Sequence, residues 1–438
     1  MNKLISEHRL ILDELYEEIK NLPLDQRIER WTALYPLSKK YFELFQNTST
    51  FCTAPWLGLN IHPEGKLFPC CAFDQKQPIG HLSQSTLQEV RDGTQMAQLK
   101  SAMLSGQKID GCQSCYKSDA VGGENLKTHL RNIHEKYIPL LSLTDQAPLL
   151  YLDVQFSNLC NLKCRICGPV FSSSWIAENQ KIPHKNNPSF KVHSIKKEHS
   201  DKWESVLNVI ENVDEVYFWG GEPVMMPEHN EFLLRLIKLG KTDVKLRYST
   251  NFTELSFSNY DTIKLWKNFS QLSIGASLDG SYARAEYMRS GSDWNKIIDN
   301  RKRLMSELPK ARFFIACATS AYNIYHISDF FKEWVDLGYV GVNDFCVNLV
   351  YDPQKLSVQT LPVDFKQRVT VKIQNLIENY IRPKFGNETV AEKRFKAAVN
   401  YMNSEDKNKQ AAEFMNYNKD LDRIRNERLY EVFPELNF

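Results

Sequence analysis

Short apolar runs alternate with stretches of helical spacing through residues 148–360. The apolar runs predict six strands, at Tyr151–Ser157, Glu215–Trp219, Val244–Thr250, Leu272–Ser277, Phe313–Thr319 and Asp344–Val350. The stretches between them predict helices at Lys202–Asn212, Glu228–Leu239, Asp261–Asn268, Trp294–Ser306 and His326–Leu337. Repeated strand–helix units of this kind predict an α/β fold built on a parallel sheet with right-handed crossovers.

Both ends of the chain show helical periodicity without strands. Residues 1–48 predict an N-terminal helical arm that Pro23 and Pro36 divide into pieces. Residues 361–438 predict a helical extension that the polar turn around Asn403–Gln410 interrupts. We interpret the arm as a packing element rather than a substrate-binding one, and the extension as a helical cover for the strand–helix region.

A hairpin pattern lies between the arm and the first of these strands. Apolar residues alternate over Leu57–Ile61, a turn follows at Pro63–Gly65, and the strand pattern resumes at Lys66. Because strand pairing brings the two ends of a hairpin together, the pattern predicts that Cys52 and Cys70 lie close to each other.

Two further cysteines complete a candidate four-thiolate site. Cys112 and Cys115 form a CxxC motif after an amphipathic helix predicted over Thr86–Leu104. Four thiolates bind either a zinc ion, as in a zinc ribbon, or an iron–sulfur cluster, and the spacing alone leaves both open. Cys71 is predicted to point to the opposite strand face from Cys70, and we interpret it as a bystander.

Three more cysteines follow directly after the first predicted strand of the repeated units. Cys160, Cys164 and Cys167 have the spacing CxxxCxxC, with no fourth cysteine nearby in the sequence. A structural zinc ion takes four protein ligands, whereas a [4Fe–4S] cluster held by three thiolates leaves one iron open to a ligand that is not protein. A structural zinc site that borrows a remote thiol is the alternative.

The composition is that of an ordinary globular protein. The 438 residues are 42% hydrophobic and 25% charged, and 55 basic against 53 acidic residues leave a formal net charge of +2. That charge gives no reason to expect a nucleic acid or membrane partner, and no apolar run approaches the roughly 18 residues that span a bilayer. Ten cysteines without a secretion signal predict a cytoplasmic protein whose thiols bind metal.

The CxxxCxxC motif after the first strand resembles that of the radical S-adenosylmethionine (SAM) enzymes. The resemblance implies a partial (β/α)6 TIM-like barrel, with its chemistry at the carboxyl ends of the strands. It implies that Cys160, Cys164 and Cys167 hold a [4Fe–4S] cluster whose open iron binds SAM. An electron from the cluster would cleave SAM to a 5′-deoxyadenosyl radical, which abstracts a hydrogen from the substrate. An electron donor such as a flavodoxin or a ferredoxin is implied as a partner.

Motifs at the ends of the later strands match the same family. A GGEP motif follows the second strand, and in the family its GGE portion receives the amino group of SAM. The resemblance assigns the binding of SAM to Gly220, Gly221, Glu222, Pro223, Asn251, Ser277, Asp279 and Arg289. Within this set, the guanidinium of Arg289 is expected on the methionine carboxylate. Each motif is weak by itself, and Arg289 alone also fits a structural salt bridge.

The earlier cysteines resemble an auxiliary-cluster domain of the SPASM/twitch type. The resemblance assigns Cys52, Cys70, Cys112 and Cys115 to a second [4Fe–4S] cluster, in the twitch form that holds one cluster. This module precedes the core here, whereas it follows the core in most relatives. The predicted domains are a helical arm (1–48), a twitch domain (49–137), a radical SAM partial barrel (148–360) and a helical extension (361–438).

The sequence therefore predicts a radical SAM oxidoreductase that oxidatively modifies a peptide, with the auxiliary cluster assisting electron transfer. Dehydrogenation of a small molecule is the alternative within that chemistry. A zinc-organised binding module and a non-catalytic iron–sulfur scaffold are alternatives from other classes. The polar, basic segment Glu178–Ser200 is either a solvated loop or a lid over the barrel mouth. Cys317 and Cys346 lie in apolar strands and are expected to be core residues, although one that faced the barrel could quench a substrate radical.

Overall fold

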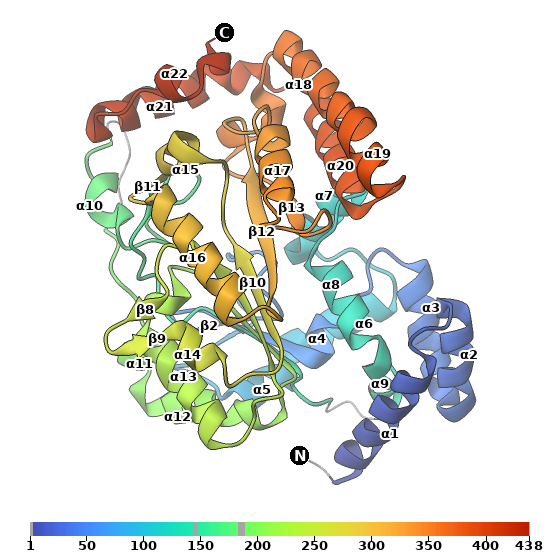
Figure 1. Ribbon diagram of the computed structural model, residues 1–438. Coiled ribbons are helices and arrows are strands. Elements are labelled where there is room, and N and C mark those ends of the chain that lie inside the picture. Colours follow the sequence, from blue (N-terminus) through green and yellow to red (C-terminus); the bar gives the residue numbers. More distant parts are fainter. Residues whose placement is uncertain (1–2, 144–146, 183–188, 438) are drawn as a thin grey trace. The chain divides into compact units, whose positions relative to one another are not determined.

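The computed structural model describes residues 3–143, 147–182 and 189–437 (Figure 1). The chain divides into two compact units. The first unit comprises Met1–Ala120, Glu124–Val154 and Ile195–Tyr217, and the second comprises Val121–Gly123, Gln155–Ser194 and Phe218–Phe438. The finer division into an arm, a twitch domain, a partial barrel and an extension remains a prediction.

The first unit contains the predicted hairpin, joined to a parallel strand. Strands β1 (Gly58–Ile61) and β2 (Lys66–Phe68) are antiparallel, with Asn60 opposite Phe68, as the alternating pattern predicts. Strand β1 also pairs in parallel with β4 (Tyr151–Val154), which sequence periodicity does not indicate. The strand order in this unit is β6 (Glu215–Phe218), β4, β1, β2 and β3 (Gly80–His81).

The rest of the first unit is mainly helical. Its helices are α1 (Lys3–Ile19), α2 (Leu24–Leu34), α3 (Lys39–Asn47), α4 (Ala54–Leu57), α5 (Leu87–Arg91), α6 (Thr94–Leu104), α7 (Gln113–Ala120), α8 (Leu126–His134), α9 (Leu140–Leu143), α11 (Ile195–Glu198) and α12 (Ser200–Asn208). One buried core joins the arm to the hairpin, because Trp31 and Phe42 of the arm share it with Trp56, Phe68 and Tyr151. This shared core fits the interpretation of residues 1–48 as a packing arm.

The second unit contains four parallel strands. They are β7 (Lys245–Thr250), β10 (Leu272–Ala276), β12 (Arg312–Thr319) and β13 (Phe345–Leu349), in the order β13, β12, β10, β7. The register places Gly275 between Ser249 and Phe314, and Ala316 opposite Cys346. Directly opposed residues share a face of the sheet, so the register decides which side chains point to the same side.

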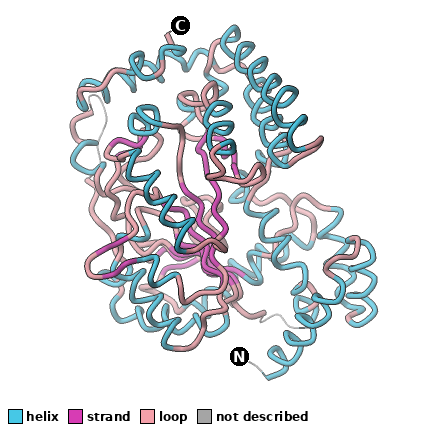
Figure 2. Tube along the Cα trace, in the orientation of Figure 1, coloured by secondary structure: helices cyan, strands magenta, loops and turns pink. Residues whose placement is uncertain are grey.

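Helices cover the strands of the second unit (Figure 2). They are α10 (Trp175–Asn179), α13 (Pro227–Lys238), α14 (Thr262–Trp266), α15 (Tyr282–Met288), α16 (Trp294–Glu307), α17 (Ile327–Asp336), α18 (Val363–Leu376), α19 (Arg382–Phe385), α20 (Val390–Ser404), α21 (Ala411–Arg425) and α22 (Leu429–Val432). Aromatic rings fill the space between α16, α17 and the strands, where Trp334 contacts Phe313, Trp294 and Phe330. Small ribbons pair β5 (Lys163–Cys164) with β11 (Arg289–Ser290), and β8 (Ser256–Phe257) with β9 (Tyr260–Asp261).

The α/β fold class, the predicted strands and the helical ends are confirmed. All six predicted strands form, within a few residues of their expected bounds, and each predicted helix between them is present as α12, α13, α14, α16 or α17. The single helix expected over Thr86–Leu104 is instead two helices, because Asp92 and Gly93 end α5 and begin α6. Residues 183–188 of the predicted lid lie outside the described residues. Among the helices that the structure describes, none is long and apolar enough to cross a membrane.

Candidate functional site

The four cysteines predicted for the auxiliary site line one pocket of the first unit. Cys52, Cys70, Cys112 and Cys115 all contribute to the wall of this pocket. Cys52 precedes α4 and Cys70 follows β2, so the hairpin brings the first two thiols together. Cys112 ends a 3₁₀ turn and Cys115 lies in the first turn of α7, which brings the CxxC pair to the same pocket.

The surroundings of these thiols disfavour free thiolates. Burial raises the pKa of Cys52 and of Cys112 to about 12, and also raises the pKa of Cys70 and Cys115. The negative charge of each neighbouring thiolate would raise the pKa of Cys70 further. The ammonium of Lys127, which forms an ion pair with Asp119, lowers the pKa of Cys52, Cys112 and Cys115, and Arg131 also lowers that of Cys52.

Iron–sulfur clusters bind through Cys thiolates, and metal binding removes the thiol protons. Apart from the thiols, the pocket is lined mainly by apolar side chains, among them Phe73, Leu99, Met103, Leu126 and Leu130. Four thiols around an apolar pocket therefore fit the predicted cluster. Among the described residues, no group of three or more His, Cys, Asp or Glu side chains is placed to hold a single metal ion.

Cys70 and its neighbour Cys71 offer a matched test of this site. Cys71 does not line the pocket, and its backbone N–H donates to Oδ2 of the buried Asp153 at 2.9 Å. We expect Cys70→Ala to lower the iron content by about four atoms per chain, because a four-cysteine cluster loses a ligand. Cys71→Ala should leave iron and acid-labile sulfide unchanged. Equal iron loss in both variants would contradict the assignment.

The other three cysteines lie in the second unit, in the loop that follows β4. Cys164 is in β5, where it pairs with Arg289 of β11, and the Cys167 amide donates to the Cys164 carbonyl at 3.0 Å. Burial raises the pKa of Cys160 and Cys167 to about 12 and also raises the pKa of Cys164. The negative charge of a Cys164 thiolate would raise the pKa of both other thiols, so the three lie within electrostatic reach of one another.

The two glycines of the GGEP motif let the backbone approach this loop closely. A Cβ on Gly220 would lie 2.2 Å from Cδ of Gln155, and one on Gly221 would lie 2.3 Å from the carbonyl oxygen of Leu159. Both glycines have positive φ, at 74° and 49°. The next amide, that of Glu222, donates to the same Leu159 carbonyl at 2.7 Å. The glycines thus fix Glu222 beside the residue that precedes Cys160.

Glu222 is a fully buried carboxylate held by three donors. Its Oε1 accepts from Thr250 Oγ1 at 2.7 Å and from the Val224 amide at 3.4 Å, and its Oε2 accepts from the Asn251 amide at 2.7 Å. Burial raises the pKa of Glu222 to about 7, although these hydrogen bonds oppose the shift. Within the described part of the chain, no Lys, Arg or His forms an ion pair with this carboxylate. Pro223 is buried next to it and begins a short 3₁₀ turn.

Asn251 connects the end of β7 to the first cysteine. Its Nδ2 lies 3.9 Å from Sγ of Cys160 and donates to Oδ1 of Asn161 at 2.8 Å. Its Oδ1 accepts from the Thr253 amide at 2.9 Å, and Asn161 in turn donates to Thr253 Oγ1 at 3.0 Å. Asn161 and Thr253 were not predicted from the sequence, because small polar residues next to a motif are common in any loop.

Arg289 and Asp279 form a buried pair beside Cys164. Arg289 Nε lies 2.9 Å from Asp279 Oδ2, and its Nη1 lies 3.6 Å from Sγ of Cys164. Asp279 Oδ1 also accepts from the Ala318 amide at 2.8 Å. The structure therefore places both predicted residues at the cysteine loop, but directs the guanidinium to Asp279 and to sulfur. The predicted contact of Arg289 with a methionine carboxylate remains a prediction. Ser277 is half-buried at the end of β10.

The register of β12 and β13 places Cys317 and Cys346 on opposite faces of the sheet. Cys317 is fully buried on β12, accepts a hydrogen bond from Asn323 Nδ2 at 3.4 Å, and has its pKa raised by burial. Cys346 lies opposite Ala316, and both are half-buried, so they share the more open face of the strands. The structure thus supports the core interpretation for Cys317 and leaves Cys346 as the cysteine on the open face.

Two buried residues near the motifs were missed. Gln155 packs against Gly220, and in the described residues its side-chain amide has no hydrogen-bond partner. Arg165, between Cys164 and Cys167, is completely buried. The sequence shows an arginine inside the three-cysteine loop, but the side chains of Asn418 and Asp422 that bind it lie more than 250 residues away along the chain.

Part of the chain matches a known protein family. Residues 52–116 match the SPASM family, an iron-sulfur cluster-binding domain, and this range contains all four cysteines of the pocket. No curated protein matches the chain. The prediction of a SPASM-type iron–sulfur domain in this part of the chain is thereby confirmed.

Several solved structures resemble the chain at low identity. Native anSMEcpe with bound S-adenosylmethionine is 19% identical, with a TM-score of 0.39, over 56% of this chain and 64% of that chain. Streptococcus suis SuiB bound to S-adenosylmethionine is 17% identical, with a TM-score of 0.34, over 60% of this chain and 52% of that chain. The chain therefore spans less than two thirds of the length of either protein. Residues 52–116 match a SPASM iron–sulfur domain, and both of these solved structures contain bound S-adenosylmethionine.

Proposed function

We propose that this protein is a radical SAM enzyme with two [4Fe–4S] clusters. Cys160, Cys164 and Cys167 would hold the cluster that binds SAM, and the four cysteines of the first-unit pocket would hold an auxiliary cluster that assists electron transfer. The cluster on the three-cysteine loop supplies, when bound, the electron for reductive cleavage of SAM.

The observation that carries this proposal is the position of Glu222. A buried carboxylate without an ion-pair partner is costly, and the pKa of Glu222, about 7 even with the charge of Arg289 acting on it, reflects that cost. An ammonium group in direct contact with Glu222 would lower its pKa and favour the ionised form. SAM carries an ammonium group, and Glu222 is fixed by its amide to Leu159, one residue before the first cysteine. The match between the Glu222 carboxylate and the ammonium group of SAM supports a site for an amino acid-like cofactor at the three-cysteine loop.

The surrounding residues hold and tune this site. Thr250 and Asn251 donate to Glu222 and fix its orientation. Asn251 and Arg289 direct N–H groups toward Cys160 and Cys164, and donors of this kind stabilise negative charge on thiolate sulfur. Asp279 balances the charge of Arg289, so that a single unpaired cation is not buried at the loop.

For the substrate, we propose a peptide, with dehydrogenation of a small molecule as the alternative. Long helical segments at both ends of the chain provide surface for a partner larger than a metabolite. SuiB has been solved bound to its precursor peptide SuiA, which concerns that protein only. A short precursor gene beside the gene for this protein would supply the peptide to test, and modification of that peptide in the presence of SAM would distinguish the two substrate classes.

Metal analysis of anaerobically purified protein tests the two-cluster proposal. We expect about eight iron atoms and about eight acid-labile sulfides per chain, because each [4Fe–4S] cluster contributes four of each. Zinc without iron at both sites would overturn the proposal in favour of a zinc-organised binding module.

A further inference from the structure

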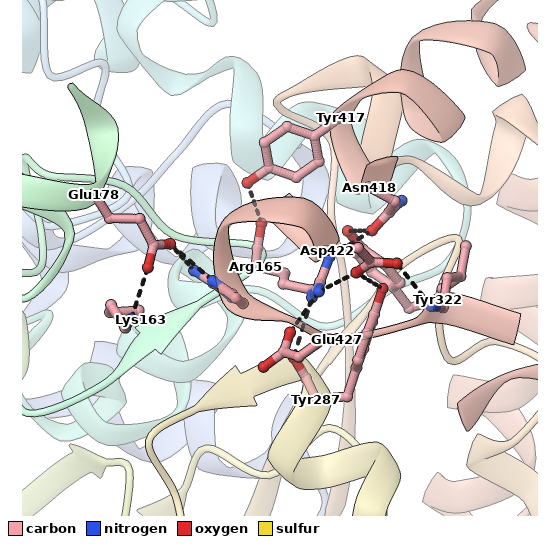
Figure 3. Close-up of polar contacts among 11 residues, drawn as sticks. Lys163, Arg165, Glu178, Tyr287, Tyr322, Tyr417, Asn418, Asp422 and Glu427 are labelled. Atoms are coloured by element: carbon pink, nitrogen blue, oxygen red, sulfur yellow. Dashed lines mark hydrogen bonds and ion pairs between the residues drawn. The ribbon is translucent and has the colours of Figure 1, made fainter. Parts of the chain in front are cut away.

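The side chain of Arg165 ties the three-cysteine loop to the C-terminal helix α21. Its guanidinium donates to Asn418 Oδ1 at 2.9 Å and reaches the carboxylates of Asp422 and Glu427 at 2.5 Å each (Figure 3). The guanidinium also lies over the ring of Tyr287, 3.6 Å from its centroid. All of these residues belong to the second unit, and the arginine side chain has no solvent exposure.

The backbone of Arg165 is held at both of its polar atoms. Its amide donates to the carbonyl of Met288 at 2.7 Å, and its carbonyl accepts from the hydroxyl of Tyr417 in α21 at 2.8 Å. The peptide units on both sides of Arg165 lead directly toward Cys164 and Cys167. A displacement of Arg165 would therefore change the separation of these two thiols.

A second set of contacts links α21 to the residues around the loop. Glu178 Oε2 accepts from Lys163 Nζ at 2.6 Å, and Glu178 Oε1 accepts from Nε of Arg425 in α21 at 2.8 Å (Figure 3). Arg425 lies over the ring of Trp175, and the Trp175 indole N–H donates to the Cys164 carbonyl at 2.9 Å. The same helix thus contacts Arg165 within the CxxC part of the motif and Trp175 and Glu178 after it, and Glu178 connects it to Lys163.

Apolar packing completes the connection. Trp175, Ile182 and Leu421 form a buried cluster, and Cys167, Tyr417 and Ile424 pack against it. A predicted cluster ligand, Cys167, therefore packs against the same buried cluster as Tyr417 and Ile424 of α21. Packed cores of this kind resist displacement, because moving one side chain opens a cavity beside the others.

The electrostatic cost of this arrangement argues against an incidental contact. Burying a guanidinium is unfavourable unless it is paired, and here two carboxylates, one amide oxygen and an aromatic ring are all directed at it. Exposed ion pairs contribute little to stability, whereas a completely buried arginine with this many partners holds its neighbours in one geometry.

We propose that Arg165 is a positioning residue for the three-cysteine cluster and that α21, with Asp422 and Glu427, is its anchor. The C-terminal extension then does more than cover the strands. It sets the geometry of the loop that would bind the cluster and SAM. This inference rests on the proposed function, because it concerns the cluster assigned to Cys160, Cys164 and Cys167.

Three variants and one matched control test the proposal. Arg165→Met removes the charge but keeps much of the length, Arg165→Lys keeps the charge but loses the planar fork, and Glu427→Gln neutralises a carboxylate that is partly exposed. Arg284→Met is the control. Arg284 also binds a side-chain carboxylate of the C-terminal segment, that of Glu435, and lies over the ring of Phe433. None of these contacts involves the cysteine loop.

Iron content, spectroscopy of the reduced cluster and hydrogen exchange provide readouts besides activity. We expect Arg165→Met to lower SAM affinity or the rate of SAM cleavage about tenfold or more, as loss of residues that orient metal ligands does elsewhere. The electron paramagnetic resonance change that SAM causes in the reduced wild-type cluster should be reduced or lost. The SAM affinity and cleavage rate of Arg165→Lys and Glu427→Gln should lie between those of Arg165→Met and wild type. Backbone amides of α21 should exchange hydrogen faster in metal-free Arg165→Met than in metal-free wild type.

The outcomes separate this inference from the proposed function. Wild-type protein that binds two clusters and cleaves SAM, together with an Arg165→Met protein identical to it in all readouts, would overturn the positioning role alone. Equal losses in Arg165→Met and Arg284→Met would overturn it as well, because they would reflect general loosening of the C-terminal segment. Wild-type protein without a SAM-binding cluster would overturn the proposed function first. Glu427→Gln keeps the test decisive if Arg165→Met does not fold.

Discussion

Replacing Cys164 by alanine is expected to abolish reductive cleavage of SAM and to remove about four iron atoms per chain. Cys164 is the central thiol of the loop, paired in β5 with Arg289, and the loop has no fourth cysteine to replace it. A three-thiolate cluster that loses one ligand keeps only two, which leaves it open to solvent and to loss of iron. The auxiliary cluster should remain, because its four cysteines line a separate pocket in the first unit.

Cys317→Ala is the matched control for this variant. Cys317 is also a buried cysteine of the second unit, but it lies on β12 and accepts a hydrogen bond from Asn323. Its replacement should leave about eight irons per chain and normal SAM cleavage. Full activity of Cys164→Ala, or an equal loss of iron in both variants, would contradict the assignment of the cluster to the CxxxCxxC loop.

The second large effect is expected at Glu222. Replacing it by glutamine keeps the shape of the side chain but removes the negative charge that would face the SAM ammonium group. Because a hydrogen bond to a charged group contributes about 1.5–3 kcal/mol, SAM should bind roughly 10- to 100-fold more weakly to Glu222→Gln. Equilibrium binding of SAM to the reconstituted protein measures this. The iron content should not change, since Glu222 is not a cluster ligand. Unchanged SAM affinity would remove Glu222 from the site.

The same residue predicts a pH dependence of the metal-free protein. The folded-state pKa of Glu222 is raised from 4.5 to about 7 by burial, so between these values the folded state binds more protons than the unfolded state. The contribution of Glu222 to stability is therefore fully present below about pH 4.5 and is lost as the pH rises to about 7. The difference in unfolding free energy between wild type and Glu222→Gln should fall by on the order of 1 kcal/mol per pH unit across this window. Denaturation by urea at several pH values measures it, and a constant difference would contradict the assigned pKa.

The repeated units could be predicted from sequence because each is a local pattern. The strand that contains Phe313 to Thr319 is an apolar run whose burial alternates from Ile315 onward, and the helix from Trp294 is capped by Asp293, so both are encoded within a few residues. The four auxiliary cysteines could also be grouped, since the hairpin and the CxxC motif are local features. The parallel pairing of β1 with β4 could not, because pairing between distant strands has no local signal.

The cofactor site shows the same limit. Family motifs indicated Glu222, Asn251, Asp279 and Arg289, and the structure brings all four to the cysteine loop of the second unit. The motifs did not indicate that the Arg289 guanidinium is directed to Asp279 and Cys164, because a motif gives a residue type and not its partner. The partners of Arg165 could not be predicted from the sequence, because Glu427 lies 262 residues further along the chain.

Reductive cleavage of SAM by the wild-type protein tests the central claim most directly. Anaerobically reconstituted protein, reduced with dithionite and incubated with SAM, should form 5′-deoxyadenosine, and the same incubation with Cys164→Ala should form none. Failure of the wild-type protein to form 5′-deoxyadenosine, with the three-cysteine cluster shown to be intact by iron analysis and spectroscopy, would contradict the account and favour a non-catalytic iron–sulfur scaffold.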